Sequence, residues 1–86
     1  MPVILSERFI SASKRLPPEA RKKLKKVFLL LDSNPRYPFL QAHPIHGTDG
    51  IYEARVDQKY RLSFQFDGEN KILRNIDNHD ECLRNP

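Results

Sequence analysis

A helical repeat of apolar residues in the first half of the chain is the feature that most constrains its fold. Apolar residues recur there three or four positions apart, as they do along one face of a helix. They are Ala20, Leu24, Val27, Phe28 and Leu31. The segment Asp32-Ser33-Asn34 then leads into Pro35, and the residue before a proline is pushed out of the helical region. We therefore predict an amphipathic helix that ends before Pro35.

A shorter helix is predicted upstream, after a β-prone run at residues 3–5. Ser6 has the residue type of a helix N-cap. The apolar residues that would lie toward one side of this helix are Phe9, Ile10, Ala12 and Leu16. The helix should stop before Pro17, and Pro18 with Glu19 suits the first turn of the next helix. The two helices would form an antiparallel pair.

The C-terminal third alternates between apolar and polar residues, which is the pattern of strands with one buried face. We predict strands at residues 51–56, 60–66 and 71–76, the last of them central in the sheet, and a tail at residues 78–86. The apolar face would carry Tyr52, Ala54, Val56, Tyr60, Leu62, Phe64 and Phe66. The polar face would carry Glu53, Arg55, Arg61, Ser63 and Gln65.

Residues 35–50 contain three prolines and two glycines, so neither a helix nor an interior strand should run through them. A loop of that length is more often functional or partner-facing than a simple connection. Together the elements predict one α+β domain over residues 1–86. Two antiparallel helices would pack on one face of a small antiparallel sheet, with the leading strand at its edge and the other face free.

The distribution of charge favours an acidic partner, either nucleic acid or protein. The net charge is +4, from 15 Lys and Arg against 11 Asp and Glu. Residues 1–31 hold eight basic and two acidic residues, a net +6, whereas the rest holds seven and nine, a net −2. The basic excess therefore lies on the predicted helices and not on the strands.

The cellular setting is also indicated by composition. Cys82 is the only cysteine, so no internal disulfide can form, which suits a reducing cytoplasm. We see neither the pattern of a signal peptide nor an apolar run long enough to cross a bilayer. We expect a soluble, cytoplasmic protein without a membrane partner.

Several short motifs follow one another in an order that is informative. They are Leu16-Pro17-Pro18-Glu19, Asn34-Pro35, Tyr52-Glu53-Ala54-Arg55-Val56, Tyr60-Arg61-Leu62-Ser63-Phe64 and His79-Asp80. In this order and spacing they resemble the RelE/ParE toxin superfamily over nearly the whole chain. The resemblance implies a RelE-like fold, a toxin of a type II toxin-antitoxin system, and a cognate antitoxin as protein partner.

The RNA-cleaving branch of that superfamily implies a definite chemistry. Its members enter the ribosomal A site and cut messenger RNA when a 2′-hydroxyl attacks the adjacent phosphate. Such a reaction needs a base, an acid and cations that stabilise charge on the phosphate. The resemblance thus implies a metal-independent endoribonuclease that inhibits translation, needs no small-molecule cofactor, and has the ribosome and messenger RNA as partners.

Three residues of the polar sheet face are the first candidates for this chemistry. Arg61 stands at what looks like the family's arginine position, and a guanidinium can hold two phosphate oxygens at once. The alternative is a surface arginine paired with Glu53 or Asp57. Glu53 and Arg55 should share a face and would supply a carboxylate base and a further phosphate contact, or form only a surface ion pair.

Two further candidates follow from the resemblance, and one class of site is rejected. His79 stands where the family often has a histidine or basic residue after the last strand, and the alternative is a turn histidine bonded to backbone. Arg74 is included although the alternation pattern does not fix its side of the sheet. His43 and His46 have no partners at zinc-like spacing, so we predict no metal site.

Basic residues outside the strands are candidates for contacts to RNA or to the ribosome. They are Arg21, Lys22, Lys25, Lys26 and Lys59. The alternative for the helical ones is a solvated helix face. RNA-cleaving relatives commonly carry a tyrosine where Leu83 stands, so two other functions stay open. These are a ParE-like, non-enzymatic inhibitor of DNA gyrase and an inactive RelE-fold binding protein.

Overall fold

The computed structural model describes residues 3–86, and Met1 and Pro2, the first residues of the predicted domain, lie outside that range. Five strands form one mixed sheet in the order β1-β5-β4-β3-β2. The strands are β1 (Val3–Leu5), β2 (His43–Pro44), β3 (Ile51–Arg55), β4 (Tyr60–Asp67) and β5 (Asn70–Asn78). The helices are α1 (Glu7–Ser13), α2 (Pro18–Ser33) and α3 (His79–Arg84), with one 3₁₀ turn, η1 (Pro38–Leu40). The predicted α+β architecture is confirmed.

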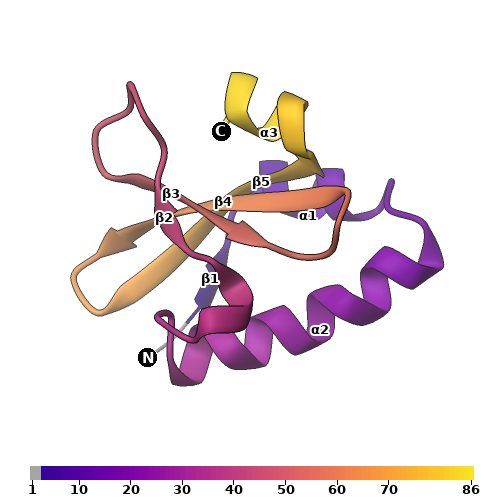
Figure 1. Ribbon diagram of the computed structural model, residues 1–86, viewed down its shortest axis with the longest axis horizontal. Helices are drawn as coiled ribbons and strands as arrows, with labels where there is room; N and C mark the ends of the chain where they lie inside the picture. Colours follow the sequence, from indigo (N-terminus) through magenta and orange to yellow (C-terminus); the bar gives the residue numbers. More distant parts are fainter. Residues whose placement is uncertain (1–2) are drawn as a thin grey trace.

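The arrangement of layers is visible in Figure 1. The helix α2 lies below the sheet and runs back past α1, whereas α3 lies above the sheet. The leading strand β1 joins the edge as predicted, but residues 3–5 run parallel to residues 71–73 of β5, so the sheet is mixed. The strand β5 therefore has a partner on each side, which accounts for its high apolar content.

Both predicted helices are present, and α2 begins and ends where the sequence indicates, but α1 ends at Ser13, before Leu16, and Ile10 of its predicted apolar side is exposed. Ser6 caps α1, because its Oγ accepts a hydrogen bond from the backbone N–H of Phe9 at 3.1 Å. The helix α2 starts with Pro18 at its first position, where the missing N–H costs nothing. The chain is therefore not helical between Ser13 and Pro18, and the apolar faces of both helices pack toward the sheet.

The hydrophobic core lies between these two helices and the sheet. From the helices it contains Phe9, Ala12, Leu16, Ala20, Leu24, Val27 and Leu31. From the strands it contains Ala54, Val56, Leu62, Phe64, Leu73 and Ile76, together with Leu40 from η1. The predicted apolar face of β3 and β4 is thus the core face, and Glu53, Arg55 and Arg61 alternate away from it.

A β-bulge explains why the side of Arg74 could not be predicted. Ser63 of β4 pairs with Asn75, but the next residue, Phe64, pairs with Leu73, so Arg74 has no partner across the β4–β5 ladder. An extra residue of this kind shifts the alternation of the strand. Leu73 and Ile76 both reach the core, and Arg74 points to the opposite face, where its side chain bonds Gln65 and Pro86.

The predicted tail and the predicted free face are both wrong. Residues 79–84 form α3, which begins at Asn78, whose Oδ1 accepts from the N–H of Glu81 at 3.0 Å. Only Cys82 of this helix is buried, so the segment carries too little apolar periodicity to be recognised in the sequence. The helix packs on β4 and β5 and covers part of the polar face.

The segment from residue 35 to 50 is mostly irregular, as predicted. It contains η1 and the two-residue strand β2, which lies at the free edge of the sheet beside β3. Gly47 and Gly50 have φ angles of 83° and 77°, which favour glycine. Within residues 3–86, no helix is both long enough and apolar enough to span a membrane.

The C-terminal end of α2 is completed by a buried lysine. The carbonyl of Leu31 would normally accept from the N–H four residues later, but that residue is Pro35, which has none. The Nζ of Lys71 on β5 donates to this carbonyl instead. Burial lowers the pKa of Lys71 below its ordinary value of 10.5, an effect that the nearby Asp32 opposes. Lys71 thus ties the sheet to the end of the helix.

The pH dependence of stability should report on this lysine. Since its pKa is lower in the folded than in the unfolded chain, the unfolded chain binds more protons between the two values. The contribution of Lys71 to the free energy of unfolding should therefore rise with pH across that interval, up to the ordinary value of 10.5. In urea denaturation, the free energy of unfolding of the wild type minus that of Lys71→Met should increase from about pH 7 to about pH 10. Comparing the two proteins cancels other titrating groups, and a difference that does not change with pH would contradict the burial of this ammonium.

Candidate active site

A buried carboxylate lies at the centre of the polar sheet face. Glu53 projects from β3 with a side chain that is only 3% exposed. Three cationic or potentially cationic groups surround its Oε1 atom: His43 Nε2 at 3.6 Å, Arg61 Nε at 3.9 Å and His79 Nε2 at 3.9 Å. They come from β2, β4 and the first residue of α3. Its Oε2 atom is buried and has no hydrogen-bond partner within residues 3–86, a state that calls for an explanation in function.

His43 is held in one tautomer beside this carboxylate. Strand β2 pairs with β3 so that His43 lies opposite Glu53. The Nδ1 atom of its ring is 2.7 Å from the carbonyl oxygen of Gln41, which can only accept, so Nδ1 carries a proton. In the neutral ring the Nε2 atom, which faces Glu53, is then free to accept a proton. The side chain is 56% exposed and open to a ligand.

His79 approaches the same carboxylate from the opposite side. Its backbone N–H donates to the carbonyl of Lys59 at 3.0 Å, which fixes the start of α3 against the β3–β4 hairpin. Its Nε2 lies near Glu53, and its Nδ1 is 3.5 Å from Oδ1 of Asp80. Both ring nitrogens thus face carboxylates, and the side chain is 49% exposed.

Arg61 is the most buried of the three groups around the carboxylate of Glu53. Its Nη1 donates to the backbone carbonyls of Asp57 and Tyr60, the second at 3.0 Å, while its Nε faces Glu53. The side chain is 16% exposed. The structure therefore contains the ion pair with Glu53 that the sequence offered as an alternative, and part of the guanidinium remains accessible.

The free cysteine below the cluster is not a nucleophile. Cys82 of α3 is fully buried, and Ser63 and Glu53 lie close to it. Burial, and after it the charge of Glu53, raises the pKa of the Cys82 thiol to about 12. A thiol that stays protonated at neutral pH is inert, so Cys82 acts as a small apolar anchor for α3.

The other predicted catalytic residues lie elsewhere. Arg74 is bonded through Nε to the carbonyl of Pro86 at 3.1 Å and through Nη1 to Gln65, so it holds the end of the described chain. Arg55 lines a groove between α2 and the β3–β4 hairpin. The ion-pair partners of Glu53 within residues 3–86 are His43, Arg61 and His79. The geometry therefore brings together Glu53, Arg61 and His79 of the predicted set, and adds His43.

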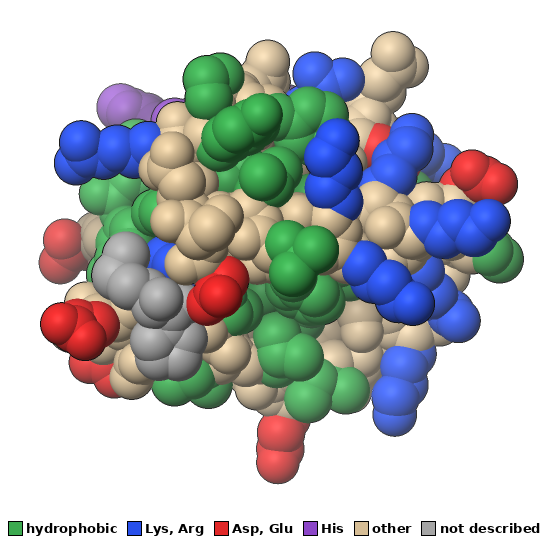
Figure 2. Space-filling model, turned by 90° about the horizontal axis from the view of Figure 1, so that it is seen from below, with side chains coloured by type: hydrophobic (Ala, Val, Ile, Leu, Met, Phe, Trp, Pro, Cys, Tyr) green, Lys and Arg blue, Asp and Glu red, His purple; other side chains and the backbone are tan. Residues whose placement is uncertain are grey.

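The predicted RNA-binding residues fall into two groups. Lys26 and Lys59 line the groove that contains Arg55, and Lys23 lines it too. Arg21, Lys22 and Lys25 are exposed outside it, and Arg21 donates to the carbonyl of Lys14 at 2.6 Å. Figure 2 shows the α2 side of the molecule, with Lys and Arg side chains gathered toward one end and hydrophobic side chains in the middle.

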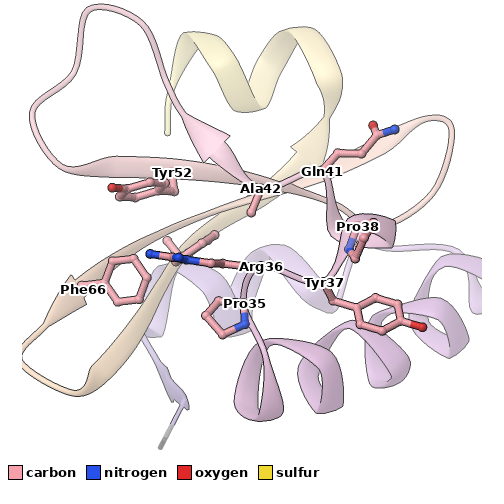
Figure 3. A pocket seen from close by; sticks show the side chains of 9 residues that line it. Pro35, Arg36, Tyr37, Pro38, Gln41, Ala42, Tyr52 and Phe66 are labelled. Carbon is pink, nitrogen blue, oxygen red and sulfur yellow. The ribbon is translucent and has the colours of Figure 1, made fainter.

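A second hollow is aromatic and lies on the other face of β3. It has a volume of about 430 Å³ between the segment 35–42 and the strands. Tyr52, Phe64 and Phe66 form one of its walls, with ring centroids 5.4 to 5.7 Å apart. The side chain of Arg36 extends across the hollow toward Phe66 (Figure 3). Because Tyr52 and Glu53 point to opposite faces, this hollow is separate from the histidine cluster.

His43 is the functional candidate that sequence reasoning missed. It was considered only as a metal ligand, together with His46, which the structure leaves exposed in the loop. Among residues 3–86, no group of three or more His, Cys, Asp or Glu side chains is arranged to hold a metal ion. The sequence gives little signal for it, because His43 lies among prolines and glycines and meets Glu53 only through the pairing of β2 with β3.

Comparison with known proteins adds structural relatives. No protein-family model matches the sequence, and no curated protein matches it significantly. The structure is similar to RelE in the RelB–RelE antitoxin–toxin complex from Methanococcus jannaschii, with a TM-score of 0.76, 22% identity, and coverage of 91% of this chain and 92% of that chain. It is similar to YafQ from E. coli, with a TM-score of 0.72 at 20% identity, covering 92% and 93%.

A third structural relative has the same fold at a lower sequence identity. The YoeB/ParE toxin from Agrobacterium tumefaciens has a TM-score of 0.76 at 13% identity, covering 92% of this chain and 99% of that chain. These identities are low, but nearly the whole length of each chain is matched. The chain therefore has the fold of the RelE/ParE toxins.

Proposed function

We propose that this protein is a toxin of a toxin-antitoxin system that cleaves RNA without a metal ion. The observation that carries the proposal is the convergence of two half-exposed histidines, His43 and His79, on one buried carboxylate. General acid–base cleavage of RNA needs one group that removes the 2′-hydroxyl proton and one that protonates the leaving oxygen. Two imidazoles that face the same carboxylate are groups of the kind that this chemistry uses.

His43 is suited to the role of general base. Its Nδ1–H is engaged by the carbonyl of Gln41, which leaves Nε2 to accept the proton of the 2′-hydroxyl. The 2′-oxygen then attacks the adjacent phosphorus. The carboxylate of Glu53, whose Oε1 lies 3.6 Å from the same nitrogen, would attract the positive charge of the imidazolium that forms.

His79 is suited to the role of general acid. Its ring lies near the carboxylates of Glu53 and Asp80, with Nε2 at 3.9 Å from the first and Nδ1 at 3.5 Å from the second. When the bond from phosphorus to the 5′-oxygen breaks, His79 gives its proton to that oxygen. The products are a 2′,3′-cyclic phosphate and a 5′-hydroxyl end, and the proton taken by His43 balances the one given by His79.

Arg61 completes the proposed site. It keeps Glu53 in place through its Nε, and its accessible edge is a donor for a non-bridging phosphate oxygen. The proposal keeps Arg61 as a phosphate ligand and His79 as an acid–base group, but it makes Glu53 a stabilising group and not the predicted base. Arg55 becomes a binding residue, and Arg74 a structural one.

The setting of the reaction is proposed from the resemblance of the sequence to the RNA-cleaving branch. We propose the ribosome-bound message in the cytoplasm as the substrate, so that the protein inhibits translation. RelE is present in a complex with the antitoxin RelB, and a cognate antitoxin is proposed here as well. Exposed apolar residues on β1 and α2, among them Ile4, Leu5 and Leu29, offer it a hydrophobic surface.

Substitution of either histidine should abolish most of the activity. His43→Ala and His79→Ala remove a proton-transfer group each, so the cleavage rate should fall by about 100-fold or more. Primer extension on message bound to purified ribosomes measures the new 5′ ends. His46→Ala is the matched control, because this exposed histidine lies in the same loop as His43 but outside the cluster. Full activity in both His43→Ala and His79→Ala would refute the proposed mechanism.

A substitution at Leu83 should increase the activity. It lies one helical turn after His79, on the same side of α3, and is partly exposed. An aromatic ring stacked on an RNA base contributes roughly 1–3 kcal/mol. Leu83→Tyr should therefore increase cleavage at subsaturating ribosome concentrations by several-fold, and Leu83→Ala should not. Equal activity of the two variants would mean that no base reaches this part of α3.

The alternative function is inhibition of DNA gyrase, in the manner of ParE. It is favoured by Leu83, because the tyrosine common among RNA-cleaving relatives is absent. Induction of the wild type with growth and RNA ends followed together separates the two functions. Growth arrest without new RNA ends, and loss of supercoiling by purified gyrase, would favour the ParE-like function. Expression without growth arrest would favour an inactive binding protein.

A further inference from the structure

A basic groove runs beside the histidine cluster, between α2 and the β3–β4 hairpin. Its volume is about 720 Å³. It is lined by Lys23, Lys26, Phe39, Arg55, Val56, Asp57, Gln58 and Lys59. Four of these side chains are cationic and one is acidic. The groove is formed by three separate parts of the chain: α2, η1 and the hairpin. Folding therefore brings together basic residues that are far apart in the sequence.

The single acid in the groove is already engaged. Asp57 Oδ1 accepts hydrogen bonds from the backbone N–H groups of Lys59 and Tyr60, at 2.8 and 2.7 Å. Its role is therefore to shape the hairpin turn. The Nε of Arg55 is buried and has no hydrogen-bond partner among the described residues. This buried nitrogen is closed to a ligand in the groove, so any contact of Arg55 with an anion there would have to come from the other nitrogens of its guanidinium.

An exposed aromatic ring lies among these cations. Phe39 of η1 is 42% exposed, and Nζ of Lys26 is 4.6 Å from its ring centroid. A ring at the edge of a positive groove is a combination found where proteins hold single-stranded nucleic acid, because bases stack on rings while lysines contact phosphates. An acidic peptide would use the lysines but would gain little from the ring.

The groove and the candidate active site are joined through the β3–β4 hairpin. Arg55 pairs across β3 and β4 with Arg61, whose Nε faces Glu53. On the other side of the hairpin, the carbonyl of Lys59 accepts from the N–H of His79. Figure 1 shows this hairpin between α2 below and α3 above. A chain that follows the groove around the hairpin therefore arrives at His79.

We propose that this groove binds the single-stranded RNA segment that flanks the cleaved phosphate, with Lys23, Lys26, Arg55 and Lys59 on its phosphates and Phe39 against a base. The inference rests on the proposed RNA function and adds the path of the substrate to it. It also divides the basic face of α2. Lys23 and Lys26 contact the substrate strand, whereas Lys22 and Lys25, which lie outside the groove, do not.

Binding of a defined RNA tests this path apart from catalysis. The probe is a fluorescein-labelled, single-stranded RNA of about 12 nucleotides with 2′-O-methyl sugars, which have no 2′-hydroxyl to attack, at a length within the site sizes typical of single-strand binders. Anisotropy titrations at several salt concentrations give the affinity and its salt dependence. For single strands, the logarithm of the binding constant falls by about 0.7 per phosphate contact for each tenfold rise in salt. Lys23→Gln/Lys26→Gln should therefore reduce the slope by about 1.4 and the affinity by about tenfold or more.

The matched control is Lys22→Gln/Lys25→Gln, which removes the same charge from the same helix. It should leave the slope and affinity for this probe close to those of the wild type. Equal losses in the two double variants would overturn the groove, because they would indicate attraction by overall charge alone. No loss in either variant would overturn it too. Equal binding of a polyglutamate peptide of the same charge, lost in Lys23→Gln/Lys26→Gln, would instead identify a site for an acidic protein segment.

The proposed catalysis and the proposed groove fail in different ways. Binding that depends on Lys23 and Lys26, together with no cleavage of ribosome-bound message, would uphold the groove and reject the RNase. Cleavage by the wild type that is unchanged in Lys23→Gln/Lys26→Gln, with unchanged binding, would uphold the RNase and reject the groove. Arg55→Lys adds a conservative variant, which keeps the charge but removes the guanidinium, and it should weaken binding of the probe.

Discussion

The burial of one carboxylate organises the polar half of this structure. A charged group that leaves water loses a large hydration energy, which partners must offset. Glu53 has partners from three elements that are distant in sequence, and each contact fixes an element: His43 fixes β2, Arg61 the hairpin, and His79 the start of α3. Loss of a partner from a buried ion pair typically costs about 3–5 kcal/mol. Here the exposed histidines and the water around them would moderate that cost.

The helix α3 is as important to the site as the carboxylate. It covers Glu53 and carries His79, and its own position depends on a few contacts. Cys82 anchors it from below, Asn78 caps its start, and Arg8, Arg74 and Asn75 bond the carbonyls of the last two residues. This arrangement gives a physical reason for Arg74. Its guanidinium lies outside the Glu53 cluster and bonds Pro86, which follows α3.

Sequence patterns predicted the elements that have a strong local period. The apolar spacing of Ala20 to Leu31, the Ser6 cap and the alternation in β3 and β4 are local signals, and each led to the observed element. The features that were not predicted depend on contacts between parts of the chain that are distant in sequence. The bulge at Arg74 changes which side of the sheet the residues of β5 face, and it depends on the pairing of β5 with β4. The helix α3 packs on the sheet through Cys82, which is buried only in the folded chain. His43 joins the site only through pairing with β3, across a segment whose glycines and prolines conceal the strand.

The candidate site itself has little charge to attract a phosphate. Glu53 offsets one positive charge, and Asp80 lies beside His79, so the cluster is close to neutral when only Arg61 and one imidazole are charged. Such a site suits acid–base chemistry, for which neutral and charged imidazoles are both needed. Attraction of an RNA chain must then come from nearby cations that have no carboxylate partner. Among residues 3–86, the four cations of the groove, Lys23, Lys26, Arg55 and Lys59, form no salt bridge, and the one acid that lines the groove, Asp57, bonds the backbone of the hairpin turn. On the proposed function, the cations that attract RNA and the groups that transfer protons would therefore lie in different parts of the molecule.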